Sequence, residues 1–230
     1  MQAFFVSCNS LTLQKLCDMI NAVIFDLDGT IGNTLKLCVE AFRKAIEPLP
    51  GRSYSDEEIK LTFGPSEEGT VMKIIPQKYE EALEAYITNY REMHDMYPEP
   101  FEGMREILYD IKAKGIKLGL VTDKGQRSCD ITLEKYGMTD IFDAVEVGSA
   151  EGPRKPCGIK TVLEKFGVPA NEAIYIGDAP SDITYSRQAG VKIISAAWAE
   201  TSDYDQLKEL EPDELFKDVS ELKDYLSRVL

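Results

Sequence analysis

The feature that most constrains this chain is the short stretch from Val23 to Thr30, with the sequence VIFDLDGT. Its first three residues are apolar and predict a short buried strand. Asp26 and Asp28 follow at a spacing of two, which places both carboxylates on one face of an extended chain. Gly29 then lets the chain turn sharply. Ligands bind beyond the carboxyl ends of the strands in an open α/β sheet, so we expect a functional site at this turn.

Two carboxylates at such a turn suit two kinds of chemistry. They bind a hard cation such as Mg²⁺ through oxygen, or one attacks as a nucleophile while the other acts as acid and base. A calcium loop of the EF-hand type needs Gly at its sixth and Glu at its twelfth position. Counted from Asp26, those positions hold Ile31 and Leu37, which disfavours such a loop. An ordinary turn with helix-capping aspartates stays open on this stretch alone.

The second half of the chain alternates between strand and helix patterns, which predicts a parallel sheet flanked by helices. Glycines follow several of the helix patterns and mark their ends. We expect strands at 117–122, 144–147, 173–177 and 191–195, the last being the final core strand, and helices at 104–114, 126–136, 158–166 and 181–189.

Further polar residues lie at the ends of these strands or in loops before helices. Thr122 ends one strand, Lys155 lies in the loop 154–156, and Asp178 follows another strand, with Asp182 shortly after it. Each of them alone has an ordinary explanation as a strand-end hydroxyl, a surface lysine, a turn residue or a helix-start residue. Parallel strands point their carboxyl ends to one edge of the sheet. We therefore expect this whole set, with the carboxylates of residues 23–30, to line one cleft at that edge, which we call the mouth.

Residues 35–98 contain helical patterns and no convincing strand. Pro98-Glu99-Pro100 ends this block and suits a stiff hinge. An aromatic stripe along its longest helix, from Tyr79 to Tyr97, is typical of core packing. The predicted organisation is therefore an α/β core formed by residues 1–34 and 99–230, with an inserted helical block of residues 35–98.

The charge of the chain limits its partners. Lys and Arg number 26 against 40 Asp and Glu, which gives a net charge of −14. Such a surface repels nucleic acid and anionic membranes, so we expect neither as a partner. It also repels phosphate compounds, so any phosphate site must be locally positive or hold a metal ion.

The cysteines and the N-terminal residues indicate the cellular compartment of the protein. Five scattered cysteines without a C-x-x-C pair predict free thiols in a reducing cytosol and no zinc site. No apolar run reaches the length of a membrane span, and the start lacks the pattern of a signal peptide. We therefore expect a cytoplasmic protein. The apolar residues within 11–20 have the spacing of a short amphipathic helix, but a start at Met19 stays open as the alternative. The cysteines are Cys8, Cys17, Cys38, Cys129 and Cys157.

From about Asn21 to near the C-terminus, the chain resembles the haloacid dehalogenase-like hydrolases, most of which are phosphatases. Val23–Thr30, Thr122, Lys155 and Gly177–Asp182 resemble the four motifs of that superfamily, in order. Within it, the chain is most similar to the phosphoglycolate phosphatase-like branch. The resemblance implies a Rossmann-like parallel sheet core flanked by helices, with a small all-helical cap domain at residues 35–98.

The resemblance and the residue types together imply catalysis through an aspartyl-phosphate. Asp26 would attack phosphorus in line, and Asp28 would protonate the leaving oxygen and then activate water. Mg²⁺ would bridge Asp26, Asp178 and the phosphate, and the resemblance adds the carbonyl of Asp28 as a ligand. Asp182 would hold a metal-bound water or orient Asp178.

The phosphate itself would be held by Thr122, Asp123 and nearby backbone N–H groups, while Lys155 neutralises its charge. Asn33 stands where many relatives carry a carboxylate, which puts the substrate rather than the chemistry in doubt. The loop around Gly64-Pro65 is the segment of the cap expected to reach the mouth and help set specificity. Because Asp28 is present, dehalogenation is disfavoured.

These residues support a Mg²⁺-dependent phosphatase acting on a small phosphate monoester such as 2-phosphoglycolate, as a monomer or homodimer. A sugar phosphomutase of the β-phosphoglucomutase-like type and a non-catalytic binding protein on the same fold remain alternatives. Cys157 is expected to be a plain thiol, and His94, the only histidine, a helix-face residue. No triad built on histidine is therefore available.

Overall fold

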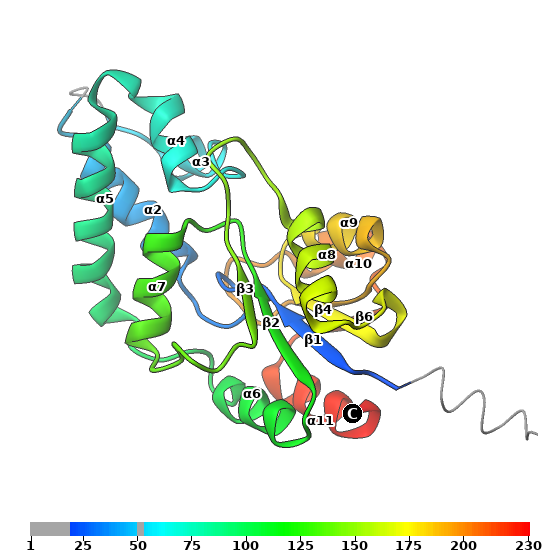
Figure 1. Ribbon diagram of the computed structural model, residues 1–230. Helices are drawn as coiled ribbons and strands as arrows, with labels where there is room; N and C mark the ends of the chain where they lie inside the picture. The colour runs from blue at the N-terminus through cyan, green and yellow to red at the C-terminus, as the bar shows by residue number, and fades with distance from the viewer. Residues whose placement is uncertain (1–18, 50–52) are drawn as a thin grey trace, which may run out of the picture.

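The computed structural model describes residues 19–49 and 53–230. Six strands form one parallel sheet in the order β3-β2-β1-β4-β5-β6 (Figure 1). The strand order reverses at β1, which pairs with β2 on one side and β4 on the other, and such a reversal is where ligands bind. The strands are β1 (Ala22–Phe25), β2 (Lys117–Val121), β3 (Ala144–Glu146), β4 (Ala173–Gly177), β5 (Lys192–Ala196) and β6 (Glu214–Phe216).

Helices of the core cover both faces of the sheet (Figure 1). One apolar cluster joins Val23 and Phe25 of β1 to α6, α7 and α11, and a second joins Ala22 and Ile24 to α8, α9 and α10. Successive strand residues point to opposite faces, so β1 must be apolar throughout to serve both clusters. The core helices are α6 (Met104–Ala113), α7 (Gln126–Lys135), α8 (Lys155–Phe166), α9 (Pro180–Ala189), α10 (Tyr204–Glu209) and α11 (Val219–Val229).

The predicted cap consists of helices that share an apolar cluster of their own. Ile131, on the core helix α7, belongs to this cluster, and the buried hydroxyls of Tyr90 and Thr132 lie 2.7 Å apart across the same contact. The cap therefore packs on α7 as well as over the sheet edge. Its helices are α2 (Leu35–Ile46), α3 (Asp56–Lys60), α4 (Glu67–Ile74) and α5 (Tyr79–Met93), with 3₁₀ turns at Pro76–Lys78 and His94–Met96.

The α/β fold class with a helical cap is confirmed, and within the described part of residues 35–98 no strand is present. The division at residues 34/35 and 98/99 stays a prediction. The expectation that 191–195 is the final strand is wrong, because β6 adds three residues beyond it. A strand so short shows no alternation that a sequence pattern can detect. The amphipathic helix expected within residues 11–20 lies almost entirely outside the described residues.

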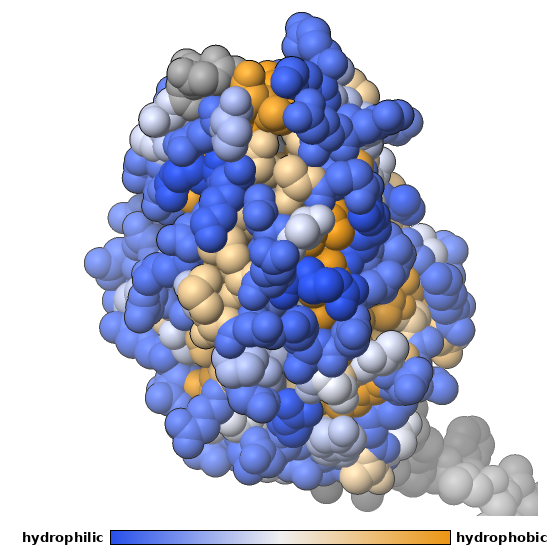
Figure 2. All heavy atoms as spheres, turned by 90° about the vertical axis from the view of Figure 1, so that its left-hand side faces the viewer, coloured by the Kyte–Doolittle hydropathy of each residue, from blue (hydrophilic) through white to orange (hydrophobic). Residues whose placement is uncertain are grey.

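The side of the molecule formed by the cap and α7 is mostly hydrophilic, with apolar side chains visible between charged ones (Figure 2). Several ion pairs on this surface join α5 or the turn after it to α7, including Arg91 with Glu134 and Lys135 with Asp95. Exposed pairs of this kind contribute little to stability, so the buried cluster holds the cap. Across the described ranges, 19–49 and 53–230, no helix has both the length and the apolarity needed to cross a membrane.

Candidate active site

The central strand delivers Asp26 to the carboxyl edge of the sheet. β1 ends at Phe25, but the backbone N–H of Asp26 still donates to the carbonyl of Ile176 at 2.9 Å and so continues the pairing with β4. The Asp26 side chain is 7% exposed, and its Oδ1 accepts a hydrogen bond from the N–H of Leu27 at 2.7 Å. The first carboxylate of the motif therefore has a fixed place at the strand-order reversal.

The turn at Gly29 brings the β1 loop against the β4 loop. Gly29 has a φ of +82°, and its N–H donates to the carbonyl of Gly32 at 2.8 Å. A Cβ atom at Gly29 would lie 2.1 Å from Oδ2 of Asp178. Only glycine meets both conditions, so the turn lets Asp178 approach the motif closely.

Lys155 links two of the carboxylates. Its Nζ lies 2.7 Å from Oδ2 of Asp26 and 2.7 Å from Oδ1 of Asp182, and all three side chains are buried. Burial opposes the charge of Lys155, but Asp182 and Asp26 outweigh it and hold the pKa of Lys155 well above its usual value. The lysine is therefore a permanent cation between them.

Asp182 is already fully engaged by the protein. Besides Lys155, its Oδ1 accepts from the Tyr175 hydroxyl at 3.1 Å, and its Oδ2 accepts from the N–H of Ala179 at 3.0 Å. Asp182 thus fixes the loop that carries Asp178. This placement suits the orienting role expected from the sequence better than direct ligation of a metal.

Three carboxylates come together around a single lysine. One ligand atom each from Asp26, Asp178 and Asp182 lies within 4.8 Å of the others. Burial, with Lys155 opposing it, raises the pKa of Asp26 to about 7, and burial together with the charges of Asp26 and Asp182 raises the pKa of Asp178 well above its usual value. Such crowding calls for a further positive charge, and hard carboxylate oxygens match Mg²⁺. The residues present therefore fit a divalent cation.

Asp28 faces a different partner. Both of its carboxylate oxygens lie 3.3 Å from Nζ of Lys124, and Oδ1 also accepts a hydrogen bond from the hydroxyl of Thr34. Its side chain is not part of the carboxylate trio, and the expected ligation through the Asp28 carbonyl stays a prediction. The two aspartates of the motif are thus separated, one toward Lys155 and the other toward the cap.

A cavity of about 410 Å³ joins the predicted residues at the sheet edge. It is lined by all five of the core set, namely Asp26, Asp28, Thr122, Lys155 and Asp178, and by Asp123.

Thr122 is buried, and its hydroxyl accepts from the N–H of Lys124 at 3.2 Å, which leaves its own proton free to donate. Burial raises the pKa of Asp123, whose carboxylate also lines the cavity and repels phosphate. Any phosphate contact from residue 123 is therefore expected from its backbone N–H.

The expected specificity residues divide into two groups. Gly64 and Pro65 line a smaller adjoining cavity of about 100 Å³, and Gly64 also lines the larger one. Asn33 lines neither cavity, and its buried Oδ1 has no hydrogen-bond partner among the described residues. The cap loop therefore reaches the mouth, whereas Asn33 lies behind it.

Sequence reasoning missed two residues of this region. Lys124 is buried against Asp28, and Glu67 of α4 accepts from the N–H of Gly125 at 2.6 Å and from the hydroxyl of Ser128 at 2.7 Å. Nothing in the residues around Lys124 signals its burial. Glu67, in the first turn of α4, has the pattern of an ordinary acidic residue at a helix start.

The remaining candidates play no part in the mouth. His94 is fully buried rather than a residue of an exposed helix face, and its Nε2 lies 3.2 Å from the hydroxyl oxygen of Thr132. Burial lowers its pKa, so it is neutral near pH 7. Cys157 is an exposed free thiol. Cys38 lies at the mouth, but burial raises the pKa of its thiol to about 12.

Replacing Gly29 by alanine tests the close approach of the two loops. We expect Gly29→Ala to lower the free energy of unfolding by about 2–5 kcal/mol, from left-handed backbone strain plus a clash with Asp178. Gly115→Ala is the matched control, because Gly115 has a φ of +75° and open space around the added Cβ. It should cost about 1–2 kcal/mol. Equal losses in urea unfolding would show that the approach to Asp178 is unimportant.

The raised pKa of Asp26 makes the metal-free protein sensitive to pH. Folded Asp26 keeps its proton up to about pH 7, whereas the ordinary value is 3.8. The folded state thus binds more protons between those values, so this contribution to stability is present below the lower pKa and is lost as the pH rises through the upper one. Unfolding in urea and EDTA should show wild type losing stability relative to Asp26→Asn between about pH 4 and pH 7. A pH-independent difference contradicts the assignment.

Comparison with known proteins places this geometry in a family. Residues 23–196 match the model of the haloacid dehalogenase-like hydrolases. The chain is 30% identical over 212 residues to pyrophosphatase PpaX of Bacillus mycoides, covering 91% of this chain and 98% of that protein.

Solved structures with the same fold include CbbY from Rhodobacter sphaeroides in complex with phosphate, with a TM-score of 0.75 at 18% identity, covering 89% of this chain and 96% of that one. A predicted phosphoglycolate phosphatase from Haemophilus somnus 129pt has a TM-score of 0.76 at 19% identity, with coverage of 90% and 98%. With the family match over residues 23–196, these findings show that the chain belongs to the haloacid dehalogenase-like hydrolases.

Proposed function

We propose that this protein is a Mg²⁺-dependent phosphatase that hydrolyses a small phosphate compound through an aspartyl-phosphate on Asp26. The observation that carries the proposal is the position of Lys155, 2.7 Å from both Asp26 and Asp182 and next to Asp178. A nucleophilic carboxylate beside a permanent cation and a second carboxylate is the arrangement that phosphoryl transfer needs. The family match and the relatives named pyrophosphatase support the same class of reaction.

In the first step, a carboxylate oxygen of Asp26 attacks phosphorus and the bond from phosphorus to the leaving oxygen breaks. Asp28 gives its proton to that oxygen. In the second step, water attacks the phosphorus of the aspartyl-phosphate, Asp28 takes a proton from the water, and the bond to Asp26 breaks to release phosphate. Each proton that Asp28 loses is thereby returned, and the enzyme ends as it began.

The other residues of the mouth hold the phosphate and its charge. Lys155 balances negative charge on Asp26 and on the phosphoryl oxygens, and the Thr122 hydroxyl has a proton to donate to one of them. Asp26 and Asp178 would hold Mg²⁺, which supplies charge neutralisation at the phosphoryl group when bound. Asp182 keeps Lys155 and the Asp178 loop in place through its three hydrogen bonds.

Two substrates stand out for this site. A phosphoglycolate-like monoester is small enough for a leaving group that enters the adjoining cavity of about 100 Å³. Pyrophosphate is favoured by the 30% identity to pyrophosphatase PpaX over nearly the whole chain. A sugar phosphomutase remains the alternative within the fold, and a non-catalytic binding protein is disfavoured by the complete set of charged groups at the mouth.

We further propose that the enzyme works in the cytoplasm as a monomer or homodimer. Cys38, Cys129 and Cys157, the cysteines within the described ranges, are free thiols, as a reducing compartment favours.

The nucleophile and the metal are tested together by phosphate release from 2-phosphoglycolate, pyrophosphate and a sugar phosphate, with Mg²⁺ or with EDTA. Asp26→Asn should lower kcat at least about 10³-fold, or about 4 kcal/mol, because an amide is a poor nucleophile and a poor metal ligand. Asp140→Asn, at an exposed position, is the matched control and should keep full activity. Wild-type turnover that is undiminished in EDTA, or Asp26→Asn within tenfold of wild type, would refute the proposal.

A further inference from the structure

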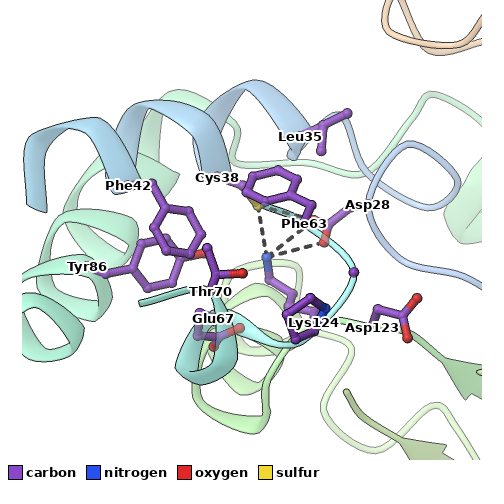
Figure 3. Close-up of a pocket in the computed structure, with 12 residues that line it drawn as sticks. Asp28, Leu35, Cys38, Phe42, Phe63, Glu67, Thr70, Tyr86, Asp123 and Lys124 are labelled. Atoms are coloured by element: carbon purple, nitrogen blue, oxygen red, sulfur yellow. Dashed lines mark hydrogen bonds and ion pairs between the residues drawn. The ribbon is translucent and has the colours of Figure 1, made fainter. Parts of the chain in front are cut away.

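Lys124 is a buried cation that the proposed reaction does not explain. Its side chain is 2% exposed, and its Nζ lies 3.3 Å from both oxygens of Asp28 and 3.2 Å from Sγ of Cys38 (Figure 3). The same atom lies 4.2 Å from the ring centre of Tyr90. Burying an ammonium group is costly unless an opposite charge accompanies it. Asp28, whose side chain is 19% exposed, is the carboxylate in contact with it, so the two form a partly buried ion pair beside the cap.

The smaller cavity lies directly beside this pair. Its lining combines core residues with cap residues, and Lys124 is the only cation among them. The cap side is mainly apolar, formed by Leu35, Phe42, Phe63 and Tyr86 together with polar Thr70 (Figure 3). An apolar wall strengthens the interaction of a charge with whatever anion enters beside it.

The acidic groups around this cavity leave Lys124 available. Both oxygens of Glu67 accept hydrogen bonds from the first turn of α7, from the N–H of Gly125 and the hydroxyl of Ser128, so that carboxylate is satisfied elsewhere. The carboxylate of Asp123 accepts a hydrogen bond from the backbone N–H of Arg154 at 3.4 Å and forms no ion pair with Lys124. Among the described residues, Asp28 is therefore the only carboxylate that forms an ion pair with Lys124.

Catalysis requires the Asp28 carboxyl group to break its contacts with Lys124. To protonate the leaving oxygen, its carboxyl must come within hydrogen-bond distance of that atom, but both of its oxygens now contact Lys124. When Asp28 turns to the substrate, Lys124 is left buried without a counter-charge, and this opposes the movement. A second negative charge on the substrate would remove that opposition if it lay beside Lys124.

We propose that Lys124 binds a second anionic group on the leaving part of the substrate, and thereby selects the substrate class. The inference rests on the proposed phosphatase function and deepens it. The class consists of small phosphate compounds that carry a carboxylate or a second phosphate no more than about three bonds from the leaving oxygen, since Lys124 contacts the residue that must touch that oxygen. 2-Phosphoglycolate and pyrophosphate belong to it, whereas simple alkyl phosphates do not.

The size of the cavity agrees with one such group. The cavity of about 100 Å³ has room for a carboxylate or a phosphate group beside Lys124. An apolar leaving group of the same size would fit the wall but would leave Lys124 unpaired. The charge of the cavity, rather than its shape, therefore determines which class of substrate binds.

The decisive experiment compares two nearly isosteric substrates, 2-phosphoglycolate and its neutral amide, phosphoglycolamide, in wild type, Lys124→Met, Lys124→Arg and Lys160→Met. Wild type should prefer the acid in kcat/KM by about 10- to 100-fold, the range expected for a hydrogen bond to a charged group. Lys124→Met should bring the two substrates to within about threefold, mainly by loss of activity on the acid. Lys124→Arg, which keeps the charge, should retain most of the preference. Lys160→Met, an exposed substitution on α8, should match wild type.

A second arm compares kcat/KM for pyrophosphate with that for methyl phosphate. It shows whether the second anionic group of the preferred substrate is a phosphate rather than a carboxylate. If wild type releases phosphate from none of these compounds, the proposed phosphatase function itself fails. If wild type is active but hydrolyses acid and amide equally, the inference about Lys124 fails while the phosphatase function stands.

An equal loss on both substrates in Lys124→Met would show that Lys124 only positions Asp28, which also overturns the inference. Folding of the variants is checked by circular dichroism and thermal unfolding. The wild-type comparison of acid and amide needs no variant, so the inference can fail even if Lys124→Met does not fold.

Discussion

The contact between Lys155 and two buried aspartates is the interaction on which the mouth of this enzyme depends. Lys155 is the first residue of α8, Asp26 follows β1, and Asp182 lies in the first turn of α9, so one ammonium group joins three separate elements. Removing it would leave the buried carboxylates of Asp26 and Asp182 without a counter-charge, next to Asp178. The same excess of negative charge makes the place suitable for a divalent cation. Stability and chemistry therefore draw on the same electrostatic arrangement.

The two aspartates of the motif pair with different buried lysines. Asp26 forms an ion pair with Lys155 at the sheet edge, and Asp28 forms one with Lys124 under the cap. The separation gives the two carboxylates different surroundings, which is how neighbouring acids take different roles in one reaction. It also ties the leaving-group side of the reaction to the cap, because Cys38 on α2 and Tyr90 on α5 contact Lys124.

Sequence patterns predicted the parts of this site that are encoded locally. The apolar run before Asp26, the glycine turn and the order of Thr122, Lys155 and Asp178 led to the sheet edge, because parallel strands gather their ends there. Lys124 escaped prediction because its burial depends on Tyr90, a residue of the cap helix α5 that is distant in sequence. The final strand escaped because three residues carry no periodicity. Contacts between distant segments, rather than motifs, determine how the substrate is chosen.

The central claim is that Asp26 carries the phosphoryl group, and the most direct measurement captures that species. Excess enzyme is mixed with Mg²⁺ and substrate, quenched in acid within one turnover, and treated with borohydride, which reduces an acyl phosphate to an alcohol. Peptide mass spectrometry then locates the reduced residue. The account predicts reduction at position 26 alone, and only when substrate is present. Turnover without reduction at position 26, or reduction at another carboxylate, would contradict it.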